Sequence, residues 1–465
     1  MTGPPRFART LAGVLAILLA GCASYEPRPL DPELEFEALL SRGGAEPPLE
    51  VQAPGPAEWF PLEPVVVLED GLSLGEANAL ALFYAPRIQD ARAALRVAGA
   101  QLLSAGLLSN PELFAGPRFS TLDGSLTLPA SLSWKLPLYG EPAAEKELAT
   151  AGLEARRQTV LEIELEVLAW VREQFVRFAY LARRQAVLNG LEQSSERVLG
   201  WVEDLRRAGG VDPATLFLAR LERDEARARA AGLRAEEATE RRQLLERIGL
   251  PPEAASSIEH SPDPARLPEI PAPDRDRLLA HPRLRAAWSR YQTAERALRL
   301  QVSRQYPDVR LGPEAEITPL ETTLGFGLGL ELPLFDRNQG GIAEAEERRL
   351  EAAAHCRATL LALIHAEAQA RADWRSAEDL LAGYRTGALT NAQEAARALD
   401  LRLSAGEANV LEVLAAQQAV ARSRLRELEL SEDETLARLR AATAGGFVLS
   451  TSAPPEAPGP PGEER

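Results

Sequence analysis

Two stretches of the chain alternate between apolar and polar side chains. From 125 to 136 the even positions are apolar, among them Leu128, Leu132 and Trp134, while the odd positions carry Ser, Thr, Pro or Lys. From 323 to 332 leucine and phenylalanine alternate with Thr, Gly and Glu. A period of two predicts β-strands with one apolar face. Weaker alternation beside each stretch predicts a partner strand, so that two hairpins form, at 111–137 and 307–333.

Longer stretches follow a helical period. The range 142–207 carries apolar residues in a seven-residue series that includes Val160, Val167 and Leu181, which is typical of coiled-coil packing. At about 1.5 Å per residue this helix is roughly 100 Å long. A second long helix is predicted at 341–403, and shorter helices at 86–109, 213–247, 282–305 and 410–444. Two short helices stacked end to end match one long helix, which predicts a rod of antiparallel helices with the strands at one end.

The two halves of the chain resemble each other. Residues 85–117 align without gaps on residues 281–313, and the same offset carries Leu136-Pro137-Leu138-Tyr139 onto Leu332-Pro333-Leu334-Phe335. After one inserted residue, Ala208-Gly209 falls on Ala405-Gly406. This pattern predicts an internal two-fold repeat. The repeats are 71–249 and 275–445, with a Pro-rich linker at 250–274 and a disordered Pro-rich tail at 446–465.

The N-terminus has the layout of an export signal. Arg6 and Arg9 precede a short apolar stretch that ends in Leu19-Ala20-Gly21-Cys22, which resembles the bacterial lipobox. The resemblance implies that residues 1–21 are removed as a lipoprotein signal peptide and that Cys22 carries lipid, with 22–70 as an extended linker from the anchor. The alternative is an ordinary signal peptide with an incidental cysteine.

Composition narrows the classes of function. The formal net charge of −16 argues against a nucleic-acid partner. Only Cys22 and Cys356 occur, so a lipidated Cys22 leaves no intrachain disulfide. His355 and His365 lie near Cys356, but no carboxylate-rich cluster completes a metal shell. No phosphate loop or nucleophile motif appears. The sequence therefore predicts no metal, no cofactor and no enzymatic activity.

The apolar face of the predicted strands must be covered by lipid or by protein. In a bilayer no sheet edge is left open, and closed barrels need about eight strands or more. Four strands per chain then require an oligomer, with eight strands from a dimer or twelve from a trimer. The alternative is a soluble pair of hairpins packed on helices. The residues predicted to face lipid are Leu128, Leu132, Trp134, Phe326, Leu328 and Leu330.

Three fragments resemble the outer-membrane efflux protein family of TolC-like outer-membrane factors. They are Asn110-Pro111-Glu112-Leu113, the segment 333–340 (PLFDRNQG) and the segment 405–414 (AGEANVLEVL). The middle one looks most like the branch that serves resistance-nodulation-division exporters, and the resemblance covers about 71–445. It implies a mainly α fold with a β-barrel, in which a homotrimer closes twelve strands into one barrel and the helices form a periplasmic tunnel.

The same resemblance implies the function, location and partners. The expected protein is a lipid-anchored outer-membrane channel that extends into the periplasm and works with a periplasmic adaptor and an inner-membrane pump in tripartite efflux. The alternatives are the conduit of type I protein secretion and, beyond channels, a periplasmic coiled-coil structural or adhesin lipoprotein.

The resemblance also points to the end of the rod farthest from the strands. In the family an acidic pair lines the closed periplasmic mouth; Glu412 matches its first member, whereas the second position is Ala415. Glu412 is therefore the gate candidate. The alternative is a purely structural role as the carboxylate of a helix capping box. The residues predicted to contact the adaptor are Gly209, Gly210, Val211, Gly406, Glu407 and Ala408.

Overall fold

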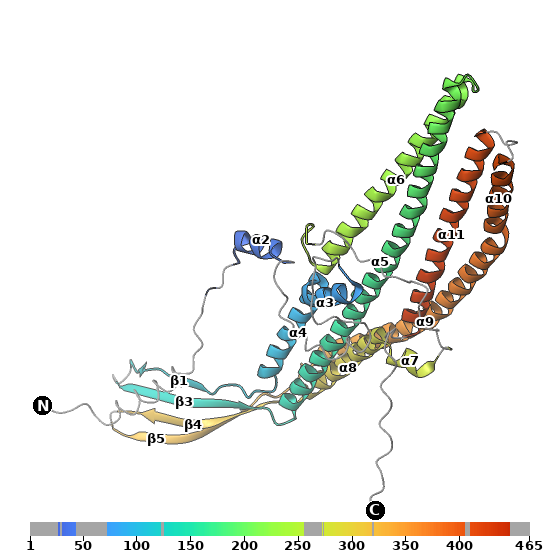
Figure 1. Cartoon of the computed structure of the whole chain (residues 1–465). Helices are drawn as coiled ribbons and strands as arrows, with labels where there is room; N and C mark the ends of the chain where they lie inside the picture. Colours follow the sequence, from blue (N-terminus) through green and yellow to red (C-terminus); the bar gives the residue numbers. More distant parts are fainter. Residues whose placement is uncertain are drawn as a thin grey trace, which may run out of the picture.

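The chain forms an elongated molecule with a sheet at one end. The computed structural model describes residues 30–42, 72–121, 125–254, 274–318, 320–404 and 410–446, together with positions 27 and 272. Over these residues the chain is mostly helical with one antiparallel sheet, and this part of the predicted fold class is confirmed. Figure 1 places the sheet at one end of the molecule and the α5–α6 and α10–α11 hairpins at the other.

Two long helical paths make the rod. Helix α5, Glu141–Arg207, is a single helix of 67 residues. The second path consists of α9 (Gln339–Tyr384), the π-helical turn η2 (Arg385–Leu389) and α10 (Thr390–Ser404). The other helices are α2 (Pro32–Leu40), α3 (Leu74–Tyr84), α4 (Pro86–Ser104), α6 (Pro213–Ile248), α7 (Arg275–Ala280), α8 (Pro282–Ser303) and α11 (Val410–Ala444). None of the helices in the described ranges is both long and apolar enough to cross a membrane.

The second long helix, predicted at 341–403, contains a π turn at η2. A π turn takes up one residue more than an α turn. Strand β5 starts 196 residues after β3, whereas α11 starts 197 residues after α6, so one extra residue lies between them. The turn is held from the facing helix, because the Arg385 guanidinium donates twice to the Glu427 carboxylate, at 2.8 and 2.6 Å.

Two predicted elements also end or break earlier than expected. Helix α4 stops at Ser104 instead of continuing to 109, because Gly106 adopts a left-handed φ of 76°. A side chain at Gly106 would collide with the Pro142 carbonyl. The partner strand predicted in the hairpin 111–137 is divided into β1 (Glu112–Ala115) and β2 (Arg118–Phe119), since Pro117 has no N–H to donate to the neighbouring strand.

The linker predicted to be extended over 22–70 contains helix α2. Asp31 caps the helix by accepting from the Glu33 amide at 3.0 Å, and Pro32 starts it. Arg42 then attaches the segment to the rod, donating to the Gly249 carbonyl at 3.2 Å and lying 5.0 Å from the centre of the Tyr84 ring. A good N-cap followed by proline is enough to start a helix here.

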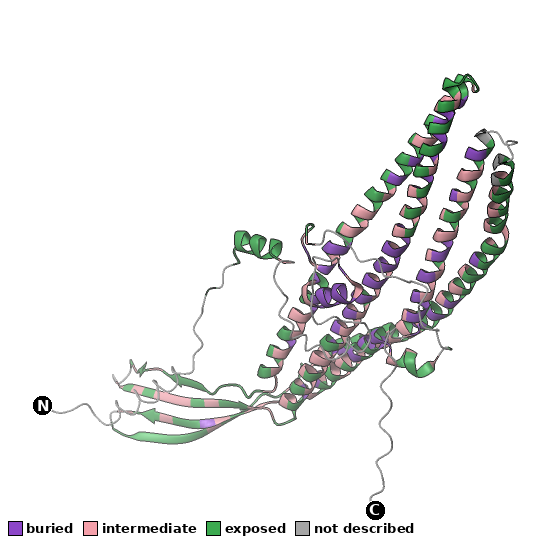
Figure 2. Ribbon diagram, in the orientation of Figure 1, coloured by how far each residue is buried: buried purple, intermediate pink, exposed green. Residues whose placement is uncertain are grey.

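The densest core lies midway along the rod, where α3 packs against α5 and the end of α6 (Figure 2). Almost every residue of α3 is buried, and Ser73 and Glu76 form a capping box at its start. The sequence pattern did not reveal α3, because a helix that is apolar on all sides has no periodic face.

The sheet has the strand order β1-β3-β4-β5, and β2 continues beside β3. Strand β3 spans Leu126–Leu136, β4 spans Val309–Ile317 and β5 spans Thr322–Leu330. Strands β3 and β4 come from different halves of the chain, so their pairing joins the halves. A side chain at Gly312 would collide with the Leu132 carbonyl, and this close approach explains the glycine.

The join between α8 and α11 depends on a buried histidine and gives the first prediction. His281 is the N-cap of α8, where its Nδ1 accepts from the Arg283 amide at 3.2 Å, and the ring also bonds to the backbone of Thr443. Burial lowers the pKa of His281 to about 4. We therefore expect the free energy of unfolding to be largest above pH 6.5 and to fall by up to about 3 kcal/mol as the pH approaches 4, since the unfolded chain takes up the proton first.

Denaturant unfolding followed by circular dichroism at several pH values tests this. His281→Asn is the matched variant, because asparagine caps helices well but does not titrate. The difference in unfolding free energy between wild type and variant should change between pH 7 and 4. A difference that is constant over this range would contradict the assignment.

Candidate functional site: sheet wall and helical tip

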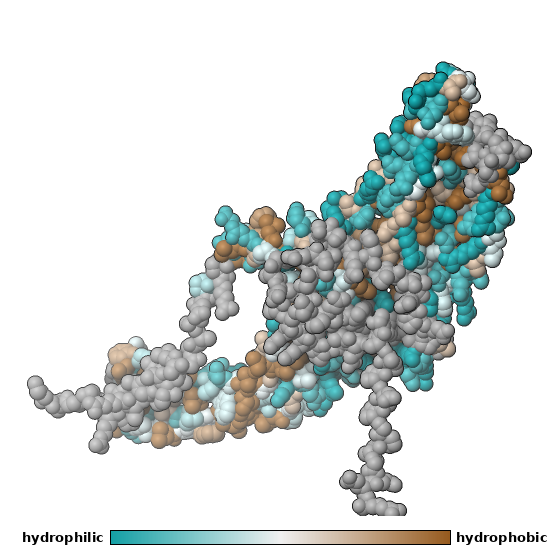
Figure 3. All heavy atoms as spheres, in the orientation of Figure 1, coloured by the Kyte–Doolittle hydropathy of each residue, from teal (hydrophilic) through white to brown (hydrophobic). Residues whose placement is uncertain are grey.

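The sheet has one apolar face. The strand register puts Leu113 beside Leu132, Trp134 beside Leu311, and Leu328 beside the same Leu311. No helix covers this face: Leu324 is 79% exposed, Leu328 73% and Phe326 67%. Hydrophobic side chains accordingly gather at the sheet end in Figure 3. All six residues predicted to face lipid lie on this face, namely Leu128, Leu132, Trp134, Phe326, Leu328 and Leu330.

The opposite face is polar except at Phe114, which lies beside Ser131. Ser131 lies beside Glu314, and Lys135 beside Arg310. On β5 this face carries Thr323 and then the glycines 325, 327 and 329. A side chain at Gly327 would collide with the Glu314 carboxylate, so the missing side chain gives this carboxylate its room. A sheet with one uncovered apolar face and one polar face is suited to a boundary between lipid and water.

Aromatic side chains mark the junction between the sheet and the helices. Trp134 Nε1 donates to the Ser109 carbonyl at 2.9 Å. The Tyr139 and Tyr306 rings stack 4.5 Å apart, and Phe335 is 94% exposed. Trp and Tyr are enriched where membrane proteins cross the membrane–water interface, because their rings are apolar and their edges polar.

The outer strands of the sheet, β1–β2 on one side and β5 on the other, pair with no further strand among the described residues. Each therefore presents a row of backbone N–H and C=O groups. Such edges are covered by another chain or pair with one.

The turn between α5 and α6 is described in full and forms one tip of the rod. Gly209 takes a left-handed φ of 78°, and the amides of Gly209 and Gly210 close the end of α5 on the Arg206 and Leu205 carbonyls. Asp212 accepts from the Thr215 and Ala214 amides, which lowers the pKa of its carboxyl. Gly209 and Gly210 are exposed, whereas Val211 packs partly into a small apolar cluster.

This cluster joins the tips of the two hairpins. It consists of Val198, Leu199, Val202, Ala219, Val413 and Leu414. The predicted contact residues Gly406, Glu407 and Ala408 lie outside the described residues, as does Cys22. The structure therefore brings together only the α5–α6 half of the predicted contact surface.

Glu412 does not stand alone at the start of α11. Its Oε2 lies 3.3 Å from Arg402 Nη2 on α10, and both side chains are about half exposed. The sequence analysis missed Arg402. Its position in the sequence was the available signal. Arg402 lies near the end of one predicted helix and Glu412 near the start of the next, so the two side chains can face each other. The pair reduces the negative charge that Glu412 presents.

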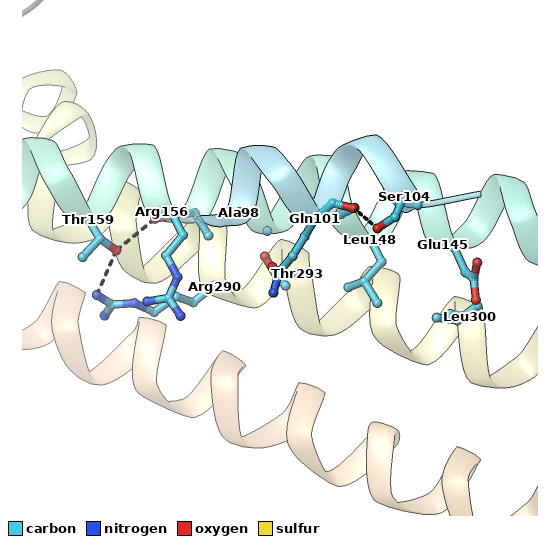
Figure 4. A pocket seen from close by; sticks show the side chains of 14 residues that line it. Ala98, Gln101, Ser104, Glu145, Leu148, Arg156, Thr159, Arg290, Thr293 and Leu300 are labelled. Atoms are coloured by element: carbon cyan, nitrogen blue, oxygen red, sulfur yellow. Dashed lines mark hydrogen bonds between the residues drawn. The ribbon is translucent and has the colours of Figure 1, made fainter. Parts of the chain in front are cut away.

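A groove of about 710 Å³ runs between α4, α5 and α8 (Figure 4). Small residues such as Ala98, Gly152 and Ala155 leave the space. Arg290 points toward Thr159 in Figure 4, with 3.4 Å between Nη2 and Oγ1, and also contacts Glu162. The groove is part of the helical wall. Among the described residues no group of three or more His, Cys, Asp and Glu side chains is placed to hold a metal.

Comparisons with known proteins agree with this geometry. The family described as Outer membrane efflux protein matches residues 275–445. The chain is 25% identical to the cobalt-zinc-cadmium resistance protein CzcC of Cupriavidus metallidurans over 335 residues, which is 70% of this chain and 78% of CzcC.

Solved structures share the fold. The outer membrane protein VceC of Vibrio cholerae is similar with a TM-score of 0.67 at 20% identity, over 81% of this chain and 97% of VceC. The open state of the MtrE outer membrane channel of Neisseria gonorrhoeae is similar with a TM-score of 0.67 at 18% identity, over 93% of this chain and 100% of MtrE.

Proposed function

We propose that the chain is a member of the outer membrane efflux protein family, whose model matches residues 275–445, and that it is the outer-membrane channel of a tripartite efflux system. It is a transport conduit of the outer membrane and not an enzyme. The observation that carries the proposal is the sheet, whose apolar face is uncovered across all its strands and whose other face is polar. In a bilayer the first face contacts lipid and the second lines the pore.

The proposed channel is a homotrimer built by repeating a contact within the chain. At the join between the halves, β4 pairs with β3 and α8 packs on α5. If the halves are copies of one unit, the same contacts form between β5 of one chain and the first strand of the next, and between their α9 and α4. Three chains then close a twelve-stranded barrel above a helical tunnel. Strands of 9 and 11 residues are long enough to span a membrane.

The proposed anchor is lipid on Cys22, which the lipobox-like sequence supports. Nine residues lie between this cysteine and the start of α2, so the ten steps along the chain reach about 33 Å when extended. Arg42, just after α2, is attached to the rod. The anchor and the barrel thus hold the same chain to the same membrane.

The proposed partners are a periplasmic adaptor and an inner-membrane pump. The tips of the α5–α6 and α10–α11 hairpins lie at the end of the rod opposite the sheet (Figure 1). At about 1.5 Å per residue α5 alone carries its tip roughly 100 Å from the sheet. Such a distance reaches deep into the periplasm, and Gly209 and Gly210 allow a partner to approach closely.

Divalent metal cations are the first substrate class to test, since the name of the relative CzcC refers to resistance to cobalt, zinc and cadmium. Disruption of the gene should raise the sensitivity of the cells to these metals, and the wild-type chain should restore resistance. Purified protein in a planar bilayer should conduct ions. A protein that restores no resistance and opens no channel would refute the proposal.

The pair Arg402–Glu412 gives a prediction for ion preference in the same bilayers. Arg402→Gln should increase the cation preference, because it leaves the Glu412 carboxylate uncompensated, and Glu412→Gln should decrease it. Each change in permeability ratio should stay within about tenfold, since exposed ion pairs are worth only roughly 0.2–1 kcal/mol. Unchanged selectivity in both variants would exclude this pair from the conduction path.

A further inference from the structure

A second cavity lies between α5, α7, α8 and α9, and the channel function does not use it. Its volume is about 570 Å³, within the range of small-molecule sites. Its apolar lining comes from Leu279, Leu284, Trp288 and Leu360. Trp288 is half exposed, so its ring is accessible to a ligand.

Polar groups without partners line the same cavity. The side chains of Arg285 and Arg357 make no hydrogen bond or ion pair to any residue that the structure describes. Other arginines of the wall are paired with carboxylates, for example Arg304 with Glu141 at 2.7 Å. The buried Oε1 of Gln158 also lacks a partner among the described residues, although its Nε2 donates to Glu154. The two unpaired cations are suited to an anionic head group, whereas the Gln158 oxygen needs a donor from water or from the body of a ligand.

The corresponding place in the first half of the chain is closed. The positions 196 residues before Trp288 and Leu360 are Arg92 and Glu164, which form an ion pair of 2.6 Å. Helix α3 has 11 residues and packs its core there, whereas its counterpart α7 has six and buries none. Among the described residues, the second half has no such ion pair and only the six-residue α7 at this place, and apolar side chains line much of its hollow.

We propose that this cavity binds an amphipathic organic anion, with an aromatic or aliphatic body against Trp288 and a carboxylate or sulfonate on Arg285 and Arg357. The chain as a whole carries a net charge of −16, so an anion is bound here by local charge and not by the overall field. The apolar lining favours a ligand with an apolar part that is buried on binding. Small inorganic anions have no such part and are therefore excluded as the preferred ligand.

The test uses the purified full-length chain and 8-anilinonaphthalene-1-sulfonate, with the uncharged N-phenyl-1-naphthylamine as the matched probe. Cys356 lines the cavity, so its alkylation rate, read by peptide mass spectrometry, reports occupancy at this place. The sulfonate should slow alkylation of Cys356, and the uncharged probe should do so only at concentrations about tenfold or more higher.

The variants Arg285→Gln and Arg357→Gln should each weaken the protection about tenfold or more. Arg375→Gln, an exposed arginine farther along α9, is the control and should change nothing. Equal protection by both probes, full protection in both variants, or no protection in the wild type would overturn the proposal.

Extraction of the purified protein with organic solvent distinguishes two sources of the ligand. An acid recovered in stoichiometric amount, together with slow alkylation before any probe is added, identifies a membrane lipid. A protein that yields no acid and reacts quickly until the sulfonate is added has a site for a soluble anion. Both results support the binding chemistry. Neither result tests ion conduction, so the binding-site proposal and the channel proposal can be refuted independently.

Discussion

A chain with Ala115→Cys and Leu330→Cys should form covalent trimers on oxidation. Within the sheet Trp134 lies beside Leu311. The corresponding neighbours across the proposed chain boundary are Leu330 of one chain and Ala115 of the next, since the halves are offset by 196 residues. Directly opposite residues of antiparallel strands have Cα atoms about 4.5–5.5 Å apart, within the reach of a disulfide.

The matched control is Ala115→Cys with Phe326→Cys, both in a chain that carries Cys356→Ser. Phe326 is four residues from Leu330 on the same strand and face, a shift of about 13 Å that a disulfide cannot bridge. Denaturing electrophoresis should show trimers for the first pair and monomers for the second. Stronger cross-linking of the control pair would mean another register, and dimers as the largest species would exclude the trimer.

Local patterns were sufficient for the regular elements. Alternation of small and large side chains in 323–332 predicted a strand, and β5 spans Thr322–Leu330. The helix predicted at 213–247 begins at Pro213, where Asp212 caps it. These features are set by neighbours along the chain, so one sequence is enough to find them.

Features that depend on contacts between distant segments were not predicted. The π turn is held by Glu427 on another helix, and nothing near Arg385 marks it. Helix α3 is buried on all sides against α5 and α6, so its pattern has no period. The partner of Glu412 became visible only when α10 and α11 were seen side by side. The sequence therefore identified the Glu412 carboxylate but not the Arg402 guanidinium that partly neutralises it.

The second large effect concerns the apolar face of the sheet. Phe326 lies at the middle of β5 and is 67% exposed on this face. In the proposed barrel Phe326→Arg puts a charge near the bilayer midplane, which costs about 2–4 kcal/mol per chain. We expect most of this variant to fail to assemble into detergent-resistant trimers in outer-membrane fractions.

Gly325→Arg is the matched control, one residue away on the polar face. No atom lies within 4 Å of the position that its Cβ would occupy, and Glu314 is its neighbour on β4. The new guanidinium can therefore pair with a carboxylate in the water-filled pore, and trimers should form in nearly normal amounts. Because adjacent residues of a strand point to opposite faces, the two variants differ in what their arginine meets and hardly in depth. Equal loss of trimers in both would mean that neither face of the sheet contacts lipid, and the channel would have to be abandoned in favour of a sheet buried against protein.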